Sequence, residues 1–217
     1  LVGGVRANRA YPMAYPRSPD HDEDAEAVTD ALRYVADNTL LDEAFSECFE
    51  ELIVEGIEVM SIDVKEVRGQ MEVVPDQVHW DRFYYDHHSR ERDFSDAEYL
   101  GVSAWMEPAA VKRMFPGNNS EIDGRMDPGA EAETFADRPG TFVDSKRKRI
   151  RVNRHCYKDD KGIWSIVYFA GAVVLKKPVV SPLVSADTEE AECPIIAQAL
   201  YVDRENYRYG YVKRLLD

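Results

Sequence analysis

The chain has 217 residues, of which 41 are acidic and 27 basic, and its formal net charge at pH 7 is -14. Its longest apolar run, residues 166–175, is well short of the ~20 residues that a membrane-spanning helix needs, so no such helix is predicted. The three cysteines are widely separated and form no Cys-x-x-Cys pair, which speaks against a disulfide framework and a zinc knuckle.

The two ends of the sequence indicate a piece of a longer protein. The first residue is Leu1 rather than methionine, and residues 207–217 are predicted to begin a helix that has no cap or breaker. Residues 1–19 are expected to be an extended connector, because Tyr11 and Tyr15 each precede a proline and therefore disfavour helix.

The acidic excess is concentrated in one region. Residues 20–63 contain 15 acidic side chains and a single basic one, Arg33, whereas the acids and bases of the remaining chain cancel. Such a region is usually a solvated helical face, and this is the favoured interpretation. The alternative is a surface for a basic partner, as in an acidic protein that competes with DNA for a DNA-binding protein.

The first half of the chain is predicted to form two helices. Acidic residues from Asp22 onward precede an apolar stripe at helical spacing, which favours an amphipathic helix that is interrupted near Asn38. Thr39, with Asp42 three residues later, resembles a capping box, so a second helix is predicted to run on to Gly56.

A β-hairpin is predicted next. Residues 57–64 alternate in polarity, and Met60, Ile62 and Val64 are expected to point inward. Residues 68–70 can turn the chain back into a second strand at residues 71–74.

Residues 74–106 hold most of the side chains that could carry chemistry. Imidazole and carboxylate groups of the kind that bind zinc or manganese occur at His79, Asp81, Asp86, His87 and His88. A metal-dependent phosphoesterase or nuclease built on them is the alternative function, since a bound metal could activate water against a phosphoester. The simpler interpretation is favoured: a strand that ends in an aromatic, polar loop, because the ligand-type residues lack a diagnostic spacing.

The rest of the chain is predicted to be mainly β-structure. A strand at Tyr99–Met106 is followed by a short helix from Pro108 to Phe115, and residues 117–140 form a polar linker. Further strands and turns follow, listed here in chain order: a hairpin at 150–157 and 163–169 with its turn at 159–162, a short strand at 173–175, an acidic loop at 185–192 and a last strand at 194–202.

The predicted fold class is α+β, with a helix pair packed on antiparallel hairpins and the start of a longer helix at the end. The predicted ranges are a domain at 1–116, a linker at 117–140, an antiparallel β segment at 141–206 and a truncated helix at 207–217.

One basic cluster interrupts the acidic balance. Residues 146–154 contain six basic side chains in nine positions, and this is the patch that could grip phosphates. A weak phosphate contact at most is expected there, by Lys146, Arg147, Lys148, Arg149 and Arg151. The favoured interpretation is a solvated strand start that the acidic helices neutralise.

An ordered series of motifs resembles one known family. The series consists of Asn8-Arg9, the helix that leads into Glu51 to Val59, Val74-Pro75-Asp76 to Asp81, Ser95 to Met106, Glu192-Cys193-Pro194, and Tyr201-Val202-Asp203-Arg204 to Tyr209-Gly210. In this order they resemble the portal (head-to-tail connector) protein of short-tailed, podovirus-type bacteriophages. The likeness extends along nearly the whole chain.

The resemblance implies a structural role without catalysis or a cofactor. It implies a phage or prophage protein that forms a homo-oligomeric ring, typically twelve-fold, at one vertex of the virion capsid after assembly in the cytoplasm of the bacterial host. Double-stranded DNA would pass through the ring during packaging and ejection. Capsid or scaffolding protein, terminase and tail adaptors would be the partners. The present residues would form the outer, wing-like part.

Overall fold

The computed structural model describes residues 13–16, 18–39, 41–67, 69–118, 143–144, 147–185 and 188–216. It combines helices with antiparallel sheets, which confirms the predicted α+β class. Among the described residues, no helix has both the length and the apolar content needed to cross a bilayer.

The chain divides into two compact units, and both are discontinuous in sequence. Unit 1 consists of Leu1–Trp80, Arg90–Phe94 and Ile195–Asp217, and unit 2 consists of Asp81–Ser89 and Ser95–Pro194. This division differs from the continuous ranges predicted from the sequence, 1–116, 117–140, 141–206 and 207–217. Most of the predicted linker, residues 119–140, lies outside the described residues.

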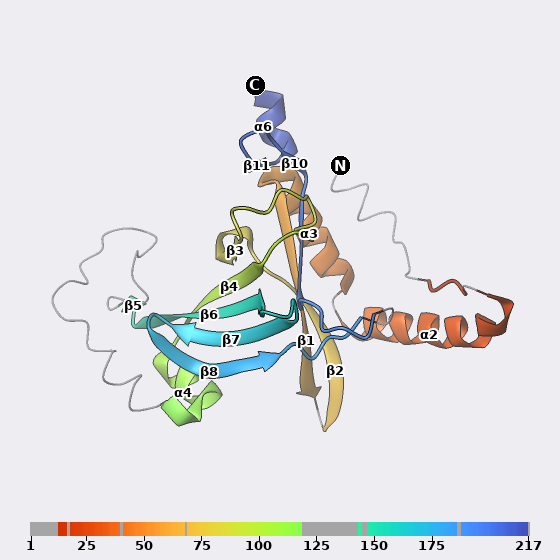
Figure 1. The fold of residues 1–217 in the computed structure, drawn as a ribbon, viewed down its shortest axis with the longest axis horizontal. Coiled ribbons are helices and arrows are strands. Elements are labelled where there is room, and N and C mark those ends of the chain that lie inside the picture. The colour runs from red at the N-terminus through yellow and green to blue at the C-terminus, as the bar shows by residue number, and fades with distance from the viewer. Residues whose placement is uncertain are drawn as a thin grey trace. The chain divides into compact units, whose positions relative to one another are not determined.

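Unit 1 is built on a three-stranded antiparallel sheet in the order β2-β1-β9. Its elements are η1 (Pro19–His21), α2 (Asp22–Asn38), α3 (Leu41–Val54), β1 (Ile57–Val67), β2 (Gln70–Gln77), β9 (Ile195–Ala199), the pair β10 (Tyr201–Val202) and β11 (Arg208–Tyr209), and α6 (Tyr211–Leu216). Helix α3 contacts both strands of the β1–β2 hairpin, and α6 contacts α3 (Figure 1). The predicted helix pair and hairpin are therefore confirmed.

The boundary between α2 and α3 differs in detail from the predicted capping box. The backbone N–H and the hydroxyl of Thr39 both donate to the carbonyl oxygen of Val35, at 2.9 and 2.7 Å. Thr39 thus closes the C-terminal end of α2 instead of capping the start of α3.

The buried face of β1 is the opposite of the one predicted. Val59 and Ser61 are buried, whereas Met60 and Ile62 are half-buried and Val64 is exposed. The cause is α3, whose Cys48 thiol donates to the carbonyl oxygen of Val59 at 3.5 Å. Because side chains alternate along a strand, covering Val59 leaves the neighbouring positions on the more open side.

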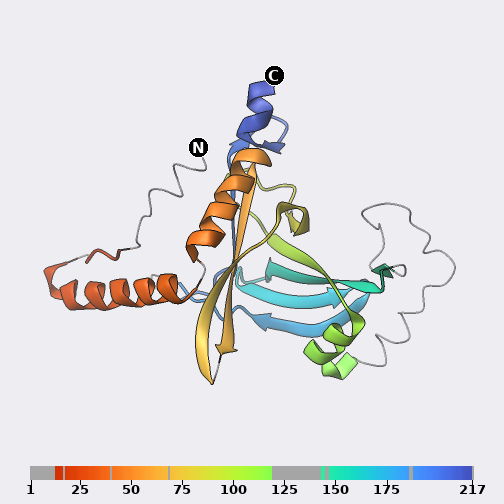
Figure 2. The same cartoon turned by 180° about the vertical axis from the view of Figure 1, so that it is seen from behind.

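Unit 2 contains an antiparallel six-stranded sheet with the path β3-β4-β6-β7-β8, in which β5 also pairs with β6. Its elements, which Figure 2 shows from behind, are β3 (Phe83–Tyr85) after the turn η2 (Trp80–Arg82), β4 (Tyr99–Met106), α4 (Pro108–Met114), η3 (Pro116–Asn118), β5 (Val143–Asp144), β6 (Arg149–Lys158), β7 (Trp164–Ala170) and β8 (Val173–Val180). The core lies where the α4 segment, with Val111 and Phe115, packs against Ile150, Val152 and Leu175.

Turn chemistry explains the β6–β7 hairpin, which is confirmed. The Asp159 carboxylate accepts the backbone N–H groups of Lys161 and Ile163, each at 2.9 Å, and Gly162 supplies the positive φ that the turn requires. Strand β8 is longer than predicted and includes Pro178. It lies at the edge of the sheet and has an irregular register with β7, so the missing N–H of proline is tolerated.

Two elements near the C-terminus have bounds that differ from the predicted ones. The last predicted strand is split into β9 and β10, and the final helix begins at Tyr211 instead of Tyr207. Tyr201 pairs with Tyr209, so the residues between them form a small hairpin, and α6 begins directly after Gly210.

Candidate functional site

The carboxylate of Asp86, a metal ligand in the alternative interpretation, organises its own loop. It is buried and accepts the backbone N–H groups of His88 at 2.9 Å and Glu98 at 3.2 Å. The His88 hydrogen bond, followed by that from Glu98, lowers the pKa of Asp86 despite the opposing effect of burial. Asp86 therefore joins the two ends of the loop between residues 86 and 98.

The other predicted ligands do not form a metal site with Asp86. The His88 side chain is 99% exposed, with Nδ1 3.2 Å from Asp86 Oδ1, and the His87 ring packs against Tyr85. His79 belongs to unit 1, where its Nε2 lies 3.4 Å from Oε1 of Glu51. Within the described part of the chain, no group of three or more His, Cys, Asp or Glu side chains is placed to hold a metal ion.

The basic segment before β6 is partly neutralised inside unit 2. Arg147 Nη1 lies 3.1 Å from Asp144 Oδ2, and Arg149 Nη1 lies 3.2 Å from Glu107 Oε1. Lys146, also predicted in this cluster, lies outside the described residues. Two of the cations thus already have carboxylate partners, which lowers their availability to phosphate.

The base of α6 is tightly joined to the C-terminal end of α3. A Cβ atom added to Gly210 would come closer than 3.0 Å to the carbonyl groups of Ile53 and Val54. The backbone N–H of Leu200 also donates to the carbonyl oxygen of Gly56 at 2.9 Å, directly after α3. The C-terminal end of α3 therefore meets two positions near the end of the chain, Leu200 and Gly210, at one point of unit 1.

Aromatic rings and cations reinforce this junction. The rings of Tyr201 and Tyr209 stack with a centroid distance of 5.3 Å and an interplanar angle of 25°. From α6, the guanidinium of Arg214 lies 5.1 Å from the Tyr201 ring centroid, and the ammonium of Lys213 lies 5.5 Å from that of Tyr209. Each contact is a cation–π interaction that ties α6 to the β10–β11 hairpin.

The segment Arg90–Phe94 supports the same junction from a loop. Arg92 donates through Nη2 to the carbonyl of Leu200, and its own carbonyl accepts the N–H of Ala199 at 2.7 Å. The Arg208 guanidinium lies 4.4 Å from the centroid of the buried Phe94 ring. Sequence reasoning missed this role because nothing local in the segment marks contacts with residues more than a hundred positions away.

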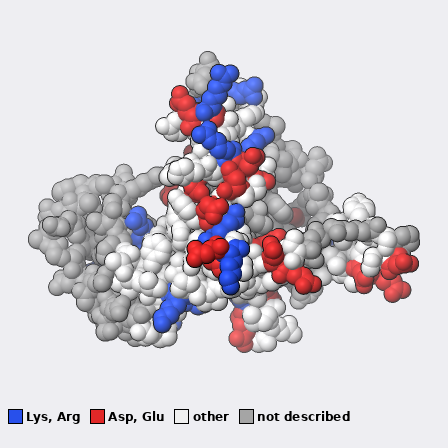
Figure 3. Space-filling model, in the orientation of Figure 1, with Lys and Arg blue, Asp and Glu red and all other residues white. Residues whose placement is uncertain are grey.

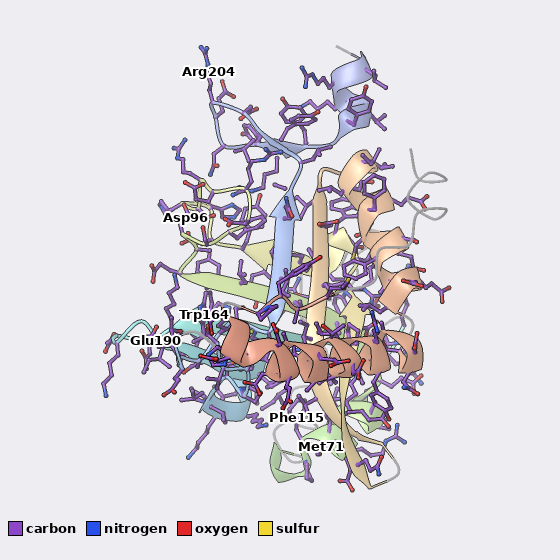
Figure 4. The ribbon with its side chains drawn as sticks, turned by 90° about the vertical axis from the view of Figure 1, so that its right-hand side faces the viewer. Met71, Asp96, Phe115, Trp164, Glu190 and Arg204 are labelled. Carbon is purple, nitrogen blue, oxygen red and sulfur yellow. The ribbon has the colours of Figure 1, made fainter. Side chains whose placement is uncertain are left out.

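Charge around the junction is mixed, unlike that of α2. Figure 3 shows blue and red side chains interleaved near the label of α6 in Figure 1, whereas acidic side chains gather at the start of α2. Arg204 lies in the turn between β10 and β11 and points away from the ribbon (Figure 4). The junction thus has a polar exterior, and its contacts hold α6 in place against α3 and the β10–β11 hairpin.

Comparison with protein-family models gives a match over the whole chain. A model of the phage P22-like portal protein family matches residues 1–217. A search of curated proteins found no match.

Proposed function

The chain belongs to the phage P22-like portal protein family, and from this premise we propose that it is a subunit of a twelve-fold portal ring that conducts double-stranded DNA into and out of the capsid. The family has a structural role in phages, as part of an oligomeric, capsid-associated ring for DNA passage. The observation that carries the proposal is the extent of the match, which includes every residue of the chain.

The proposal includes the partners of such a ring. Capsid or scaffolding protein would surround it, terminase would dock on it during packaging, and tail adaptors would attach to it afterwards. Assembly would take place in the cytoplasm of the bacterial host, and the mature position would be the capsid vertex of the virion.

We also propose that the chain has no catalytic activity. Two residues of the alternative metal site make other contacts: the Asp86 carboxylate accepts two backbone N–H groups, and His79 lies beside Glu51. A nuclease would need several of these side chains to converge on one ion. The geometry therefore favours the structural role over hydrolysis.

The charge distribution supports passage of DNA without strong binding. Each Lys or Arg that contacts a phosphate adds affinity of the same kind for every sequence, which would retard a moving duplex. The net charge of -14, and the ion pairs of Arg147 and Arg149, keep that affinity low.

The proposal is tested by expressing the complete open reading frame that contains these residues and imaging the purified product by negative-stain electron microscopy. Closed rings with a central opening are expected. A second sample carries Gly210→Glu, which places a large side chain at the base of α6, and it should form few rings. The matched control is Gly117→Glu, at a glycine with open space around it. A well-folded product that never forms rings would refute the portal proposal.

A further inference from the structure

One face of the unit 2 sheet carries a hollow that the portal role does not explain. Residues alternate along β6, so Ile150 and Val152 face the core with α4, while Arg151 and Asn153 belong to the opposite face. On that face is a pocket of about 420 Å³, within the range of small-ligand sites. Its lining includes Arg82, Tyr84, Ser103, Arg151, Asn153 and Phe169.

The position of Arg151 distinguishes it from its neighbours on the same segment. Arg147 and Arg149 are paired with carboxylates, as described above. Among the described residues, no carboxylate pairs with Arg151, its Nε has no hydrogen-bond partner, and its guanidinium lies 5.9 Å from the centroid of the Trp105 ring. Within the part of the chain that the structure describes, the pocket therefore holds a cation that no ion pair neutralises.

The neutral polar groups of the pocket also offer donors. Ser103 donates through its hydroxyl to Oδ1 of Asn153 at 2.7 Å, which occupies the amide oxygen and leaves the NH₂ group of this buried side chain to donate. Arg82, which is exposed on η2, adds a second guanidinium, against the single acid Asp81 in the lining. The excess of donors and positive charge selects a ligand that accepts hydrogen bonds and carries negative charge.

Beside these charged groups, the pocket is lined by the aromatic side chains of Phe83, Tyr84 and Phe169. Tyr84 lies against the backbone of Gly101, where a Cβ would collide with its ring, and its hydroxyl is 3.2 Å from Nδ1 of His155. Burial raises the pKa of Tyr84 and lowers the pKa of His155. The phenol therefore keeps its proton and the imidazole stays neutral near pH 7, so the positive charge of the site comes from the two arginines.

From this arrangement we infer that the pocket binds a carboxylate side chain of an acidic peptide segment of a partner protein, with an adjacent apolar side chain on the aromatic wall. Arginine beside aromatic rings is the combination that dominates the energy of protein–protein contacts. Duplex DNA fits less well, because it needs an extended basic surface, whereas this pocket is a single donor cluster in a strongly acidic chain. The inference holds whether or not the chain forms a ring, and in a portal the segment would belong to a docking protein.

The test uses the 217-residue chain labelled with ¹⁵N and two capped tripeptides, glutamate–phenylalanine–glutamate and glutamine–phenylalanine–glutamine. The side-chain signals of Asn153 NH₂ and Arg151 Nε–H report on the pocket itself. We expect the glutamate peptide to shift both signals saturably, with a dissociation constant on the order of 1 mM for so small a ligand. The glutamine peptide should shift neither signal. The net negative charge of the chain repels only the glutamate peptide, so stronger binding of that peptide cannot come from the overall charge.

Two substitutions and one control assign the binding to the arginines. Arg151→Gln and Arg82→Gln should each weaken binding of the glutamate peptide about tenfold or more, the typical effect of losing one charge-assisted hydrogen bond. Arg82 is exposed, so its variant remains informative if Arg151→Gln unfolds the sheet. Arg113→Gln, at an exposed arginine on α4, should leave binding unchanged.

Three outcomes would overturn the inference. The first is equal binding of the two peptides, and the second is no shift of the pocket signals at 10 mM peptide, a concentration about ten times the expected dissociation constant. The third is a 12-base-pair duplex that moves the same signals at lower concentration than the peptide in physiological salt, which would make phosphate the ligand. The titration measures peptide binding to the separate 217-residue chain, so its outcome does not depend on whether the protein assembles into a ring.

Discussion

Gly56 and Gly210 lie so close together that a Cβ atom on Gly56 would come within 3.0 Å of the backbone nitrogen of Gly210. Gly56 also has a φ of +91°, a conformation that side chains with a Cβ rarely adopt. Gly56 ends the turn after α3, and Gly210 precedes α6. The close approach of these two backbones is therefore what fixes the terminal helix to unit 1.

The first prediction concerns this contact. Gly210→Ala should destabilise the chain by about 1–3 kcal/mol, because the added methyl group must displace backbone atoms of α3. Urea unfolding followed by circular dichroism would measure it as a lower midpoint. Gly117→Ala, with open space around it, should change stability by less than about 0.5 kcal/mol. Equal stability of Gly210→Ala and the natural chain would show that the junction is looser than described.

The second prediction concerns Asp86 and pH. Asp86→Asn should cost about 1–2 kcal/mol near pH 7, because the two backbone N–H groups bond to different carboxylate oxygens and asparagine keeps only one acceptor oxygen. Its NH₂ group, which only donates, would face the other N–H. The folded pKa is lowered, so this stabilisation is fully present above the unfolded value of about 3.9 and is lost as pH falls through the folded pKa. Unfolding curves of the two proteins should thus converge only in acid.

His88→Ala is the matched control for Asp86. The His88 side chain is 99% exposed, and the hydrogen bond to Asp86 that matters most comes from its backbone, which alanine retains. Its effect on stability near pH 7 should therefore be small. If His88→Ala lowered the stability as much as Asp86→Asn, the imidazole of His88, and not its backbone N–H, would be the group that holds the loop.

The third prediction concerns the thiols. Burial, followed by the nearby Glu58, raises the pKa of Cys48 to about 12, and a hydrogen bond with Cys193, followed by burial, raises that of Cys156. At pH 8 about one Cys48 thiol in ten thousand would be a thiolate, the form that reacts. Iodoacetamide should therefore leave both residues unlabelled in the folded protein, as peptide mass spectrometry would detect.

The control for the thiol experiment is the same labelling in concentrated urea. There, all three cysteines of the chain should react at the rate of free cysteine. Rapid labelling of Cys48 in buffer alone would mean that α3 separates readily from β1, contrary to the buried contact between the Cys48 thiol and Val59.

The fourth prediction is weak DNA binding that disappears with added salt. The acidic excess opposes approach of a duplex, and Arg147 and Arg149 already lie beside carboxylates. Fluorescence anisotropy with labelled duplex DNA at physiological salt should show little change. Submicromolar binding that is abolished by alanine at Lys146, Arg147, Lys148 and Arg149 would instead make this cluster a DNA-binding surface.

Local elements could be predicted from the sequence because local chemistry determines them. The bounds of β4 agree with the prediction, and the turn at Asp159 was identified by its residues alone. Alternation along β1 was also visible, but which face is buried depends on where α3 packs. The alternation alone does not show where α3 packs, so Ile62 was predicted to point inward, whereas the buried residue is Val59.

The candidate sites depended on contacts between distant residues and were therefore harder to predict. Strand β9 returns to pair with β1, with Ile57 opposite Ala199, and no local pattern indicates this partner. The same holds for the junction at Gly210, although Tyr209-Gly210 was part of the family resemblance. The alternative metal site rested on residue types that do bind metals, but the Asp86 carboxylate accepts backbone N–H groups, and a sequence does not display such contacts.

The last prediction is that a protein of these 217 residues alone does not assemble into a stable closed ring. Helix α6 has six residues, and an isolated helix shorter than ~12–15 residues is marginal in water, so it offers little as a contact beyond its junction with α3. A ring needs the same sufficient interface at every junction between subunits. The exposed acidic residues of α2 would also repel one another if neighbouring copies brought these faces together. Light scattering after size exclusion at micromolar concentration should therefore give a monomer or small oligomer. A discrete particle of about twelve subunits would show that these two units close the ring by themselves.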